Sequence, residues 1–138
     1  MANIVLINAY ISIAANVLSS SGNSVQIDYS AAELDDTAFG DNTKSSLGGL
    51  KDWSLKVDLN QDYAAGAADA ILFPLVGTVV AFEIRPDAGA VSASNPKFTG
   101  TGLVTSYNPI GGKVGDKAAC SITLKPGGTT PTLTRATA

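Results

Sequence analysis

Histidine is absent from this chain of 138 residues, and cysteine occurs once, at Cys120. Without histidine the chain cannot form a Ser-His-Asp or Cys-His nucleophile pair, and most zinc sites are excluded as well. A single cysteine cannot form an internal disulfide, so nothing indicates a disulfide framework or an oxidising compartment. These two shortages argue against an enzyme and against a disulfide-stapled secreted domain.

Charge and long apolar runs are also scarce. Charged residues make up 15% of the chain, the net charge is −3, and the nine basic residues are scattered singly. This pattern gives no electrostatic reason to bind nucleic acid tightly. The apolar N-terminus lacks a basic start and is interrupted by Asn3, Asn8 and Asn16, so we interpret it as β structure rather than a signal peptide or membrane span. Synthesis in a cytoplasm is the default expectation.

The chain has enough hydrophobic residues to form the core of a single domain, which we expect to cover residues 1–138. Hydrophobic residues are 45% of the chain, and a chain of this length buries roughly two-thirds of its unfolded surface. Apolar and polar residues alternate with period two in several short runs, which is the pattern of half-buried strands. The predicted strands are Tyr10–Asn16, Val25–Ser30, Trp53–Leu59, Thr78–Arg85, Phe98–Tyr107 and Ala118–Lys125.

The alternation also predicts which side chains form the core. In the run that begins at Trp53, the odd-numbered residues are apolar and the even-numbered ones are polar. Cys120 has the phase of the inward face, where cysteine behaves as a small hydrophobe rather than a reactive thiol. The predicted core residues are Trp53, Leu55, Val57, Phe82, Ile84, Cys120 and Ile122.

One alanine-rich segment, between Asp62 and Gly77, has a helical pattern instead. Asp62 can cap the first turn, Pro74 would kink or shorten the helix, and Gly77 is a natural stop. The whole pattern therefore predicts a mainly β fold: a β-sandwich or half-barrel of about seven strands with one central α-helix packed on it.

Two segments lack any periodicity. Residues Asp36–Asp52 read as a polar, glycine-rich loop of about seventeen residues, and long loops within compact domains are usually functional or disordered. The tail, Pro126–Ala138, contains two prolines and is expected to be flexible on its own. Because no catalytic constellation accompanies the loop, we expect it to make contacts rather than to do chemistry.

Four residues have the spacing of a calcium-binding loop. Asp58, Asn60, Asp62 and Asp69 occupy positions one, three, five and twelve of a calcium-loop spacing, but position six is Tyr63 where such a loop needs glycine. The simpler interpretation is a strand end followed by a helix cap, so we expect no metal and no other cofactor. A monomeric β-sandwich that binds calcium or a sugar stays the alternative function, although aromatics for sugar stacking are only 7% of the chain.

The order of several short blocks resembles the major tail tube proteins of long-tailed (siphovirus-like) bacteriophages. The blocks run in the same order around one central helix and span roughly residues 25 to 138. They are Glu33–Asp41, Gly49–Trp53, Leu72–Thr78, Phe82–Pro86, Asn95–Gly100 and Leu133–Arg135.

The resemblance implies a structural virion protein that self-assembles into hexameric rings, stacked to form a hollow phage tail tube for DNA ejection. It implies contacts with the tape-measure, tail initiator or baseplate, and tail terminator proteins, and a location in the virion tail. DNA would pass through the lumen without specific binding, because six copies that each carry −3 would repel it. The loop and tail would contact neighbouring subunits, through Asp36, Thr37, Phe39, Asp41, Thr43, Lys44, Leu47, Leu50 and Arg135.

Overall fold

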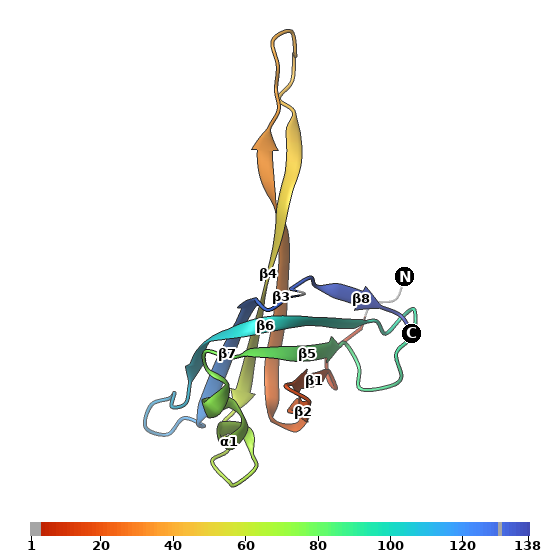
Figure 1. The fold of residues 1–138 in the computed structure, drawn as a ribbon. Coiled ribbons are helices and arrows are strands. Elements are labelled where there is room, and N and C mark those ends of the chain that lie inside the picture. The colour runs from red at the N-terminus through yellow and green to blue at the C-terminus, as the bar shows by residue number, and fades with distance from the viewer. Residues whose placement is uncertain (1–3, 130) are drawn as a thin grey trace.

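The computed structural model describes residues 4–129 and 131–138 as one antiparallel β-sheet with a single short α-helix (Figure 1). Met1–Asn3 and Thr130, which belong to the predicted N-terminal region and tail, lie outside the described residues. The strands are β1 (Tyr10–Ile13), β2 (Asn16–Val17), β3 (Gly22–Asp35), β4 (Ser46–Asn60), β5 (Val79–Arg85), β6 (Lys97–Asn108), β7 (Ala119–Pro126) and β8 (Thr134–Ala136). The helices are α1 (Ala68–Leu72) and two 3₁₀ turns, η1 (Ser19–Ser21) and η2 (Phe73–Leu75).

The sheet has the order β2-β1-β5-β6-β7-β4-β3, and β8 pairs with the start of β6. It curls so that its two ends approach each other: a Cβ added to Gly22 of β3 would lie 2.8 Å from Ile11 Cδ1 of β1. Among the described strands the two ends do not pair. An apolar groove of about 330 Å³ lies beside β3 and is lined by Leu6, Val25, Ile84 and other residues. The expected mainly β half-barrel with one central helix is confirmed.

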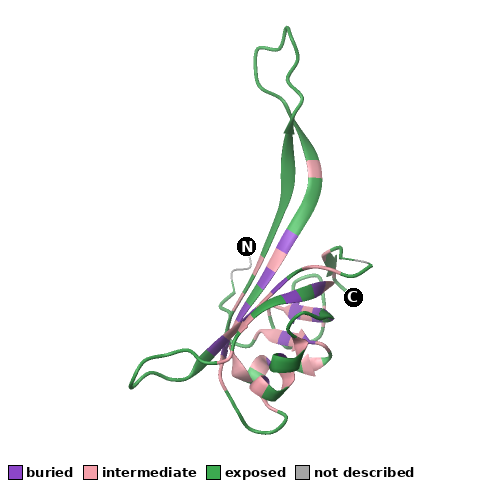
Figure 2. Ribbon diagram, turned by 60° about the vertical axis from the view of Figure 1, so that its left-hand side comes forward, coloured by how far each residue is buried: buried purple, intermediate pink, exposed green. Residues whose placement is uncertain are grey.

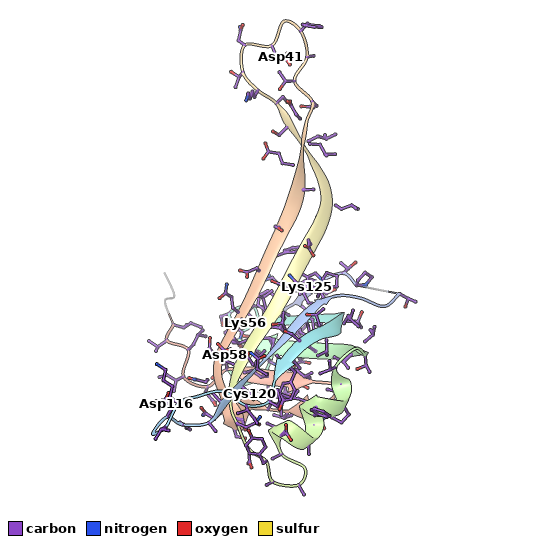
Figure 3. The ribbon with its side chains drawn as sticks, turned by 90° about the vertical axis from the view of Figure 1, so that its left-hand side faces the viewer. Asp41, Lys56, Asp58, Asp116, Cys120 and Lys125 are labelled. Carbon is purple, nitrogen blue, oxygen red and sulfur yellow. The ribbon has the colours of Figure 1, made fainter. Side chains whose placement is uncertain are left out.

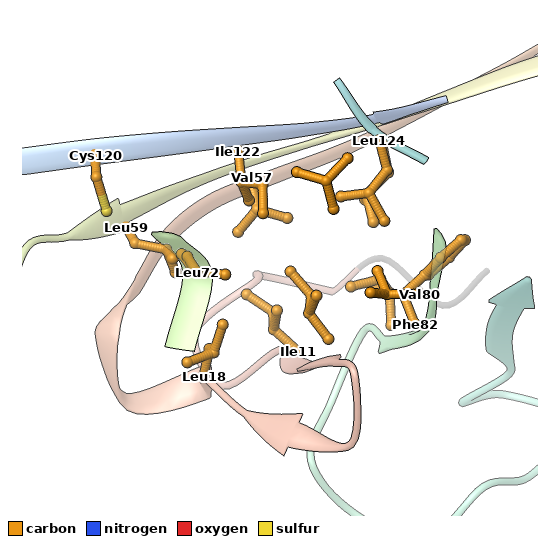
Figure 4. Packing of buried hydrophobic residues seen from close by; sticks show 14 of the residues in the cluster. Ile11, Leu18, Val57, Leu59, Leu72, Val80, Phe82, Cys120, Ile122 and Leu124 are labelled. Carbon is orange, nitrogen blue, oxygen red and sulfur yellow. The ribbon is translucent and has the colours of Figure 1, made fainter. Parts of the chain in front are cut away.

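The core lies on the inner side of the curled sheet, with the helix over one end (Figure 4). Alternate residues of β4, β5 and β7 point into it, as period-two patterning requires. Leu72 of α1 and Leu18, just before η1, are also buried there. The seven side chains predicted to form the core are all buried: Trp53, Leu55, Val57, Phe82, Ile84, Cys120 and Ile122.

Trp53 connects the core to the C-terminal segment. Its indole ring is 3% exposed and tilted against Phe82, with ring centroids 5.1 Å apart. Its Nε1–H donates a hydrogen bond of 2.7 Å to the carbonyl oxygen of Pro131. Only glycine fits at position 102 across from it, because an added Cβ there would lie 2.8 Å from Trp53 Cη2.

The helix is shorter than the sequence predicts. It begins at Ala68 with Ala67 as N-cap, and no side chain caps it. The Asp62 carboxylate instead accepts a hydrogen bond of 3.0 Å from the Ala64 N–H and closes a separate turn. Gly66 lies between them with φ of +77°, a conformation that a right-handed helix does not contain, so the prediction of Asp62 as helix cap is wrong.

The predicted loop and tail also contain more strand than expected. Residues 46–52 belong to β4, so the loop is confined to residues 36–45. This half of β4 is paired with β3 but is exposed on both faces. Because neither face is buried, its sequence shows no alternation of apolar and polar residues. In the tail, Thr134–Ala136 form β8 against Lys97–Thr99, a short strand that the sequence pattern does not indicate.

We predict that Trp53→Ala lowers the free energy of unfolding by about 3–5 kcal/mol, because it removes a buried aromatic side chain and leaves a cavity against Phe82. Urea denaturation followed by circular dichroism measures the change. Trp53→Phe is the matched control: it keeps an aromatic ring but loses the bond to Pro131, and we expect a smaller loss. An alanine variant as stable as the parent protein would contradict burial of the ring.

Candidate assembly interface

The hairpin of β3 and β4 extends far beyond the core as a two-stranded ribbon (Figures 1 and 2). Leu55–Asn60 of β4 pair with β7, whereas residues 46–54 pair with β3 alone. Within the described residues, β3 itself pairs only with β4. An isolated two-stranded hairpin is at best marginally stable in water, so the outer half of this ribbon lacks the support that strands normally receive.

Large apolar side chains lie exposed along the ribbon and at its tip. Leu34 of β3 and Leu47 of β4 are direct cross-strand partners and share one face. The exposed fractions are 51% for Tyr29, 52% for Leu34, 109% for Phe39, 56% for Leu47 and 88% for Leu50. Exposed apolar residues gathered on one projecting element are typical of a contact surface for another protein.

The outer edge of β3 has little protection against pairing with another strand. Its fourteen residues, GNSVQIDYSAAELD, contain neither proline nor lysine, the residues that commonly block exposed edges. Two register shifts, between Gly22 and Ser24 and between Ala31 and Glu33, interrupt its ladder with β4, and the pairing between them is regular. The ribbon therefore offers backbone donors and acceptors along an edge that a second chain could use.

The tip loop, residues 36–45, has a defined conformation. The Asp36 N–H donates to the Ser45 carbonyl (3.0 Å), and the Ser45 N–H donates to Thr37 Oγ1 (2.8 Å). Farther out, the Ala38 N–H donates to Asp41 Oδ2 at 2.7 Å. Hydrogen bonds from the Thr37 side chain and backbone hold the pKa of the Asp35 carboxyl below its usual value. The loop thus presents its side chains from a hydrogen-bonded frame.

Eight of the nine candidate interface residues come together on this ribbon. Asp36, Thr37, Phe39, Asp41, Thr43 and Lys44 are in the tip loop, and Leu47 and Leu50 are on β4. All eight are exposed. Arg135 is also exposed but lies apart from them, on β8 in the body of the protein, opposite Phe98 of β6.

Sequence reasoning missed two apolar residues of the ribbon, Tyr29 and Leu34. Tyr29 has the phase of the buried face of β3, but it lies where the ribbon leaves the core and is half exposed. Leu34 follows a run of small and polar residues without alternation. Its pairing with Leu47 would have been visible only if Ser46–Asp52 had been recognised as the return strand of a hairpin.

The calcium-loop pattern is not assembled into a site. Asp58 lies on β4 between its sheet partners Ser24 and Ser121, and Asn60 ends the same strand. The Asp69 carboxylate accepts a hydrogen bond of 2.8 Å from the Tyr107 hydroxyl, and Asp62 bonds the Ala64 N–H. In residues 4–129 and 131–138, no group of three or more His, Cys, Asp or Glu side chains is placed to hold a metal ion.

Two other groups of chemical interest lie beside this segment and are unsuited to nucleophilic chemistry. Burial, with the Asp69 and Asp58 charges, raises the pKa of the Cys120 thiol, which keeps it protonated. Burial is also the main cause that raises the pKa of Tyr107 to about 12. Both side chains act as structural parts of the core edge rather than as reactive groups.

Solved structures with the same fold come from two tails and one virion. A structure of the tail of an empty gene transfer agent (GTA) particle with C6 symmetry matches at a TM-score of 0.65 and 22% identity, over 88% of this chain and 87% of that one. The virion of a native GTA particle matches at 0.67 and 19%, over 92% and 95%. The SPP1 tail tube matches at 0.68 and 14%, over 95% and 76%.

This chain therefore has the fold found in these tail structures. No protein-family model matches the sequence, and no curated protein sequence matches it significantly. The helices of the described part of the chain include none that is both long enough and apolar enough to cross a membrane.

We predict that millimolar calcium leaves the melting temperature unchanged within about 1 °C, because the four oxygen-bearing side chains lie apart. A ligand that binds only the folded state at a hundred times its Kd would add about 2.7 kcal/mol to the stability, which thermal unfolding readily detects. Magnesium at the same concentration controls for general ionic effects. A saturable rise with calcium alone would revive the binding-module alternative.

Proposed function

We propose that this protein is a subunit of a phage-type tail tube, a structural virion protein that self-assembles into stacked hexameric rings. The observation that carries the proposal is the β3–β4 ribbon. In residues 4–129 and 131–138, the part of this ribbon beyond Trp53 pairs only with itself, and it exposes apolar side chains and an unpaired strand edge. Such a ribbon is stable and useful only when a neighbouring molecule covers it.

The similar structures support the proposed form of the assembly. The GTA tail has C6 symmetry and the SPP1 structure is a tail tube, so six copies per ring are the natural proposal. A further apolar segment needs a partner as well: Ile4, Val5, Leu6 and Ile7 are 59–85% exposed in succession. Four adjacent apolar side chains outside the core fit a protein whose final environment is a polymer.

The tube would act as a conduit for DNA ejection. Its net charge of −3 per subunit disfavours adhesion of passing DNA to the protein. Its expected partners are the tape-measure protein inside the immature tube and the initiator or baseplate and terminator proteins at its two ends. The ribbon and the exposed face of Arg135 are the candidate contact surfaces between subunits.

Removal of the ribbon should abolish assembly without unfolding the body. Ala31 and Lys51 are direct cross-strand partners, so replacing residues 32–50 with Asn-Gly closes the hairpin with a favoured two-residue turn. We expect the shortened protein to stay monomeric by analytical ultracentrifugation at concentrations where the parent protein forms rings or tubes by negative-stain electron microscopy.

Emission from Trp53, the one tryptophan in the chain, reports whether the shortened protein keeps its core, because this side chain is buried beside the ribbon base. A point variant at an exposed aromatic away from the ribbon, Phe73→Ser, controls for the loss of apolar surface in general and should assemble normally. The proposal fails if the parent protein stays monomeric under all conditions, including with a tail initiator complex. Normal tubes from the shortened protein would show that the ribbon is not an assembly element.

A further inference from the structure

Two turns far apart in the sequence have the same construction. In Ala38-Phe39-Gly40-Asp41, the Ala38 N–H donates to Asp41 Oδ2 at 2.7 Å and the Asp41 N–H donates to the Ala38 carbonyl at 3.2 Å. In residues 113–116, the Lys113 N–H donates to Asp116 Oδ2 at 3.1 Å and the Asp116 N–H donates to the Lys113 carbonyl at 3.0 Å. The aspartate closes each turn twice, once by side chain and once by backbone.

Each turn holds one apolar side chain out into solvent. Its third residue is a glycine with positive φ, +93° at Gly40 and +90° at Gly115, as a type II turn requires. Its second residue is apolar and fully exposed, Phe39 at 109% and Val114 at 105%. These are the two highest values for large hydrophobic residues in the described part of the chain. Other exposed apolar side chains accompany each turn: Ile110 is in the same loop as Val114, and Leu34 and Leu47 flank the tip loop. Exposed apolar side chains gathered in this way are typical of a contact surface.

The two turns lie far apart in the folded protein. Asp41 is at the tip of the ribbon, and Asp116 is at the side of the body, in the loop between β6 and β7 (Figure 3). Figure 1 separates the same two loops, with the ribbon tip at the top and the β6–β7 loop at the lower left. The two turns of one copy therefore do not meet, so a contact between them requires two copies.

The charges around the two turns are complementary. The ribbon end, residues 33–47, carries four carboxylates against Lys44, a net −3. The far loop, residues 109–118, carries Lys113 and Lys117 against Asp116, a net +1. Asp116 is already engaged in closing its turn. No side-chain hydrogen bond or ion pair of Asp36, Lys113 or Lys117 is found among the described residues, so these charges are available to a neighbour.

We propose that the Phe39 turn of one copy docks on the Val114 turn of the next copy along the tube. This inference rests on the proposed tail-tube function and names the contact between successive copies. Phe39 packs against Val114 and the 82% exposed Ile110, while Asp36 faces Lys113 and Lys117. Because the two surfaces differ, the contact is heterologous and repeats without limit along one direction.

Pairwise cross-linking tests the contact directly. The one native cysteine, Cys120, is buried and has a raised pKa, so it stays silent to a short bismaleimide. Phe39→Cys and Val114→Cys proteins, mixed under assembly conditions, should give cross-linked dimers, whereas neither alone should. The double variant should give a ladder of multimers. As a matched control, Phe73→Cys, at a site 65% exposed and outside both turns, should give no product with either partner.

Charge reversal with rescue provides an independent measurement. Asp36→Lys and Lys113→Glu should each raise the critical concentration for assembly, measured by sedimentation, by about fivefold at low salt. The two changes combined should restore the critical concentration of the parent protein, because the two charges are then exchanged and still attract each other. Added salt should shrink the effect of each single change. Within the described part of the chain, the Asp36 and Lys113 side chains have no hydrogen-bond or ion-pair partner, so the monomers should melt like the parent protein.

The possible outcomes distinguish failure of the proposed docking contact from failure of the proposed tail-tube function. Tubes that form normally, without cross-links between positions 39 and 114 and without rescue by the double reversal, would overturn the docking and leave the tail-tube function standing. Failure of the parent protein to form any ring or tube would overturn the function first. Cross-links between two Phe39→Cys copies would replace the proposed contact with a symmetric one between tips.

Discussion

The β3–β4 ribbon is bound to the rest of the protein only at its base, and this one constraint governs the other features of the structure. From Leu55 to Leu59, β4 is flanked by both β3 and β7; from Ser46 to Ser54 it pairs with β3 alone among the described strands. The base must therefore be rigid if the ribbon is to keep a direction. Leu55, Val57 and Leu59 are completely buried there, which supplies the rigidity.

Trp53 stands at the point where burial ends. Its ring packs on Phe82 of β5, and its N–H fixes the carbonyl of Pro131, which leads into β8. Three parts of the chain, the ribbon, the middle of the sheet and the C-terminal segment, thus share one contact. A change in the ribbon's angle would strain all three, so forces applied at the tip are resisted by the whole core rather than by β4 alone.

The sequence reveals those parts of the fold in which one face is buried. Alternation of Trp53, Leu55 and Val57 predicts β4 because burial selects every second residue. The same strand from Ser46 to Asp52 is exposed on both faces, so no periodicity marks it and it reads as a loop. Alanines suggest a longer helix, but Gly66 adopts a positive φ that composition alone does not reveal. β8 is too short to carry a pattern and is held by its pairing with β6.

Only part of the candidate interface can be predicted from the sequence. Polar composition points to residues 36–45, yet the matched turns at Phe39 and Val114 depend on which donor each aspartate accepts, and that is a property of the folded chain. The proposed contact joins two different surfaces, the Phe39 turn of one copy and the Val114 turn of the next. Each added copy presents the same free end as the last, so nothing within the chain defines where growth stops. If the chain forms a tail tube as proposed, a tube of fixed length would need other proteins to set its length and to end its growth, which are the roles proposed for the tape-measure and terminator partners.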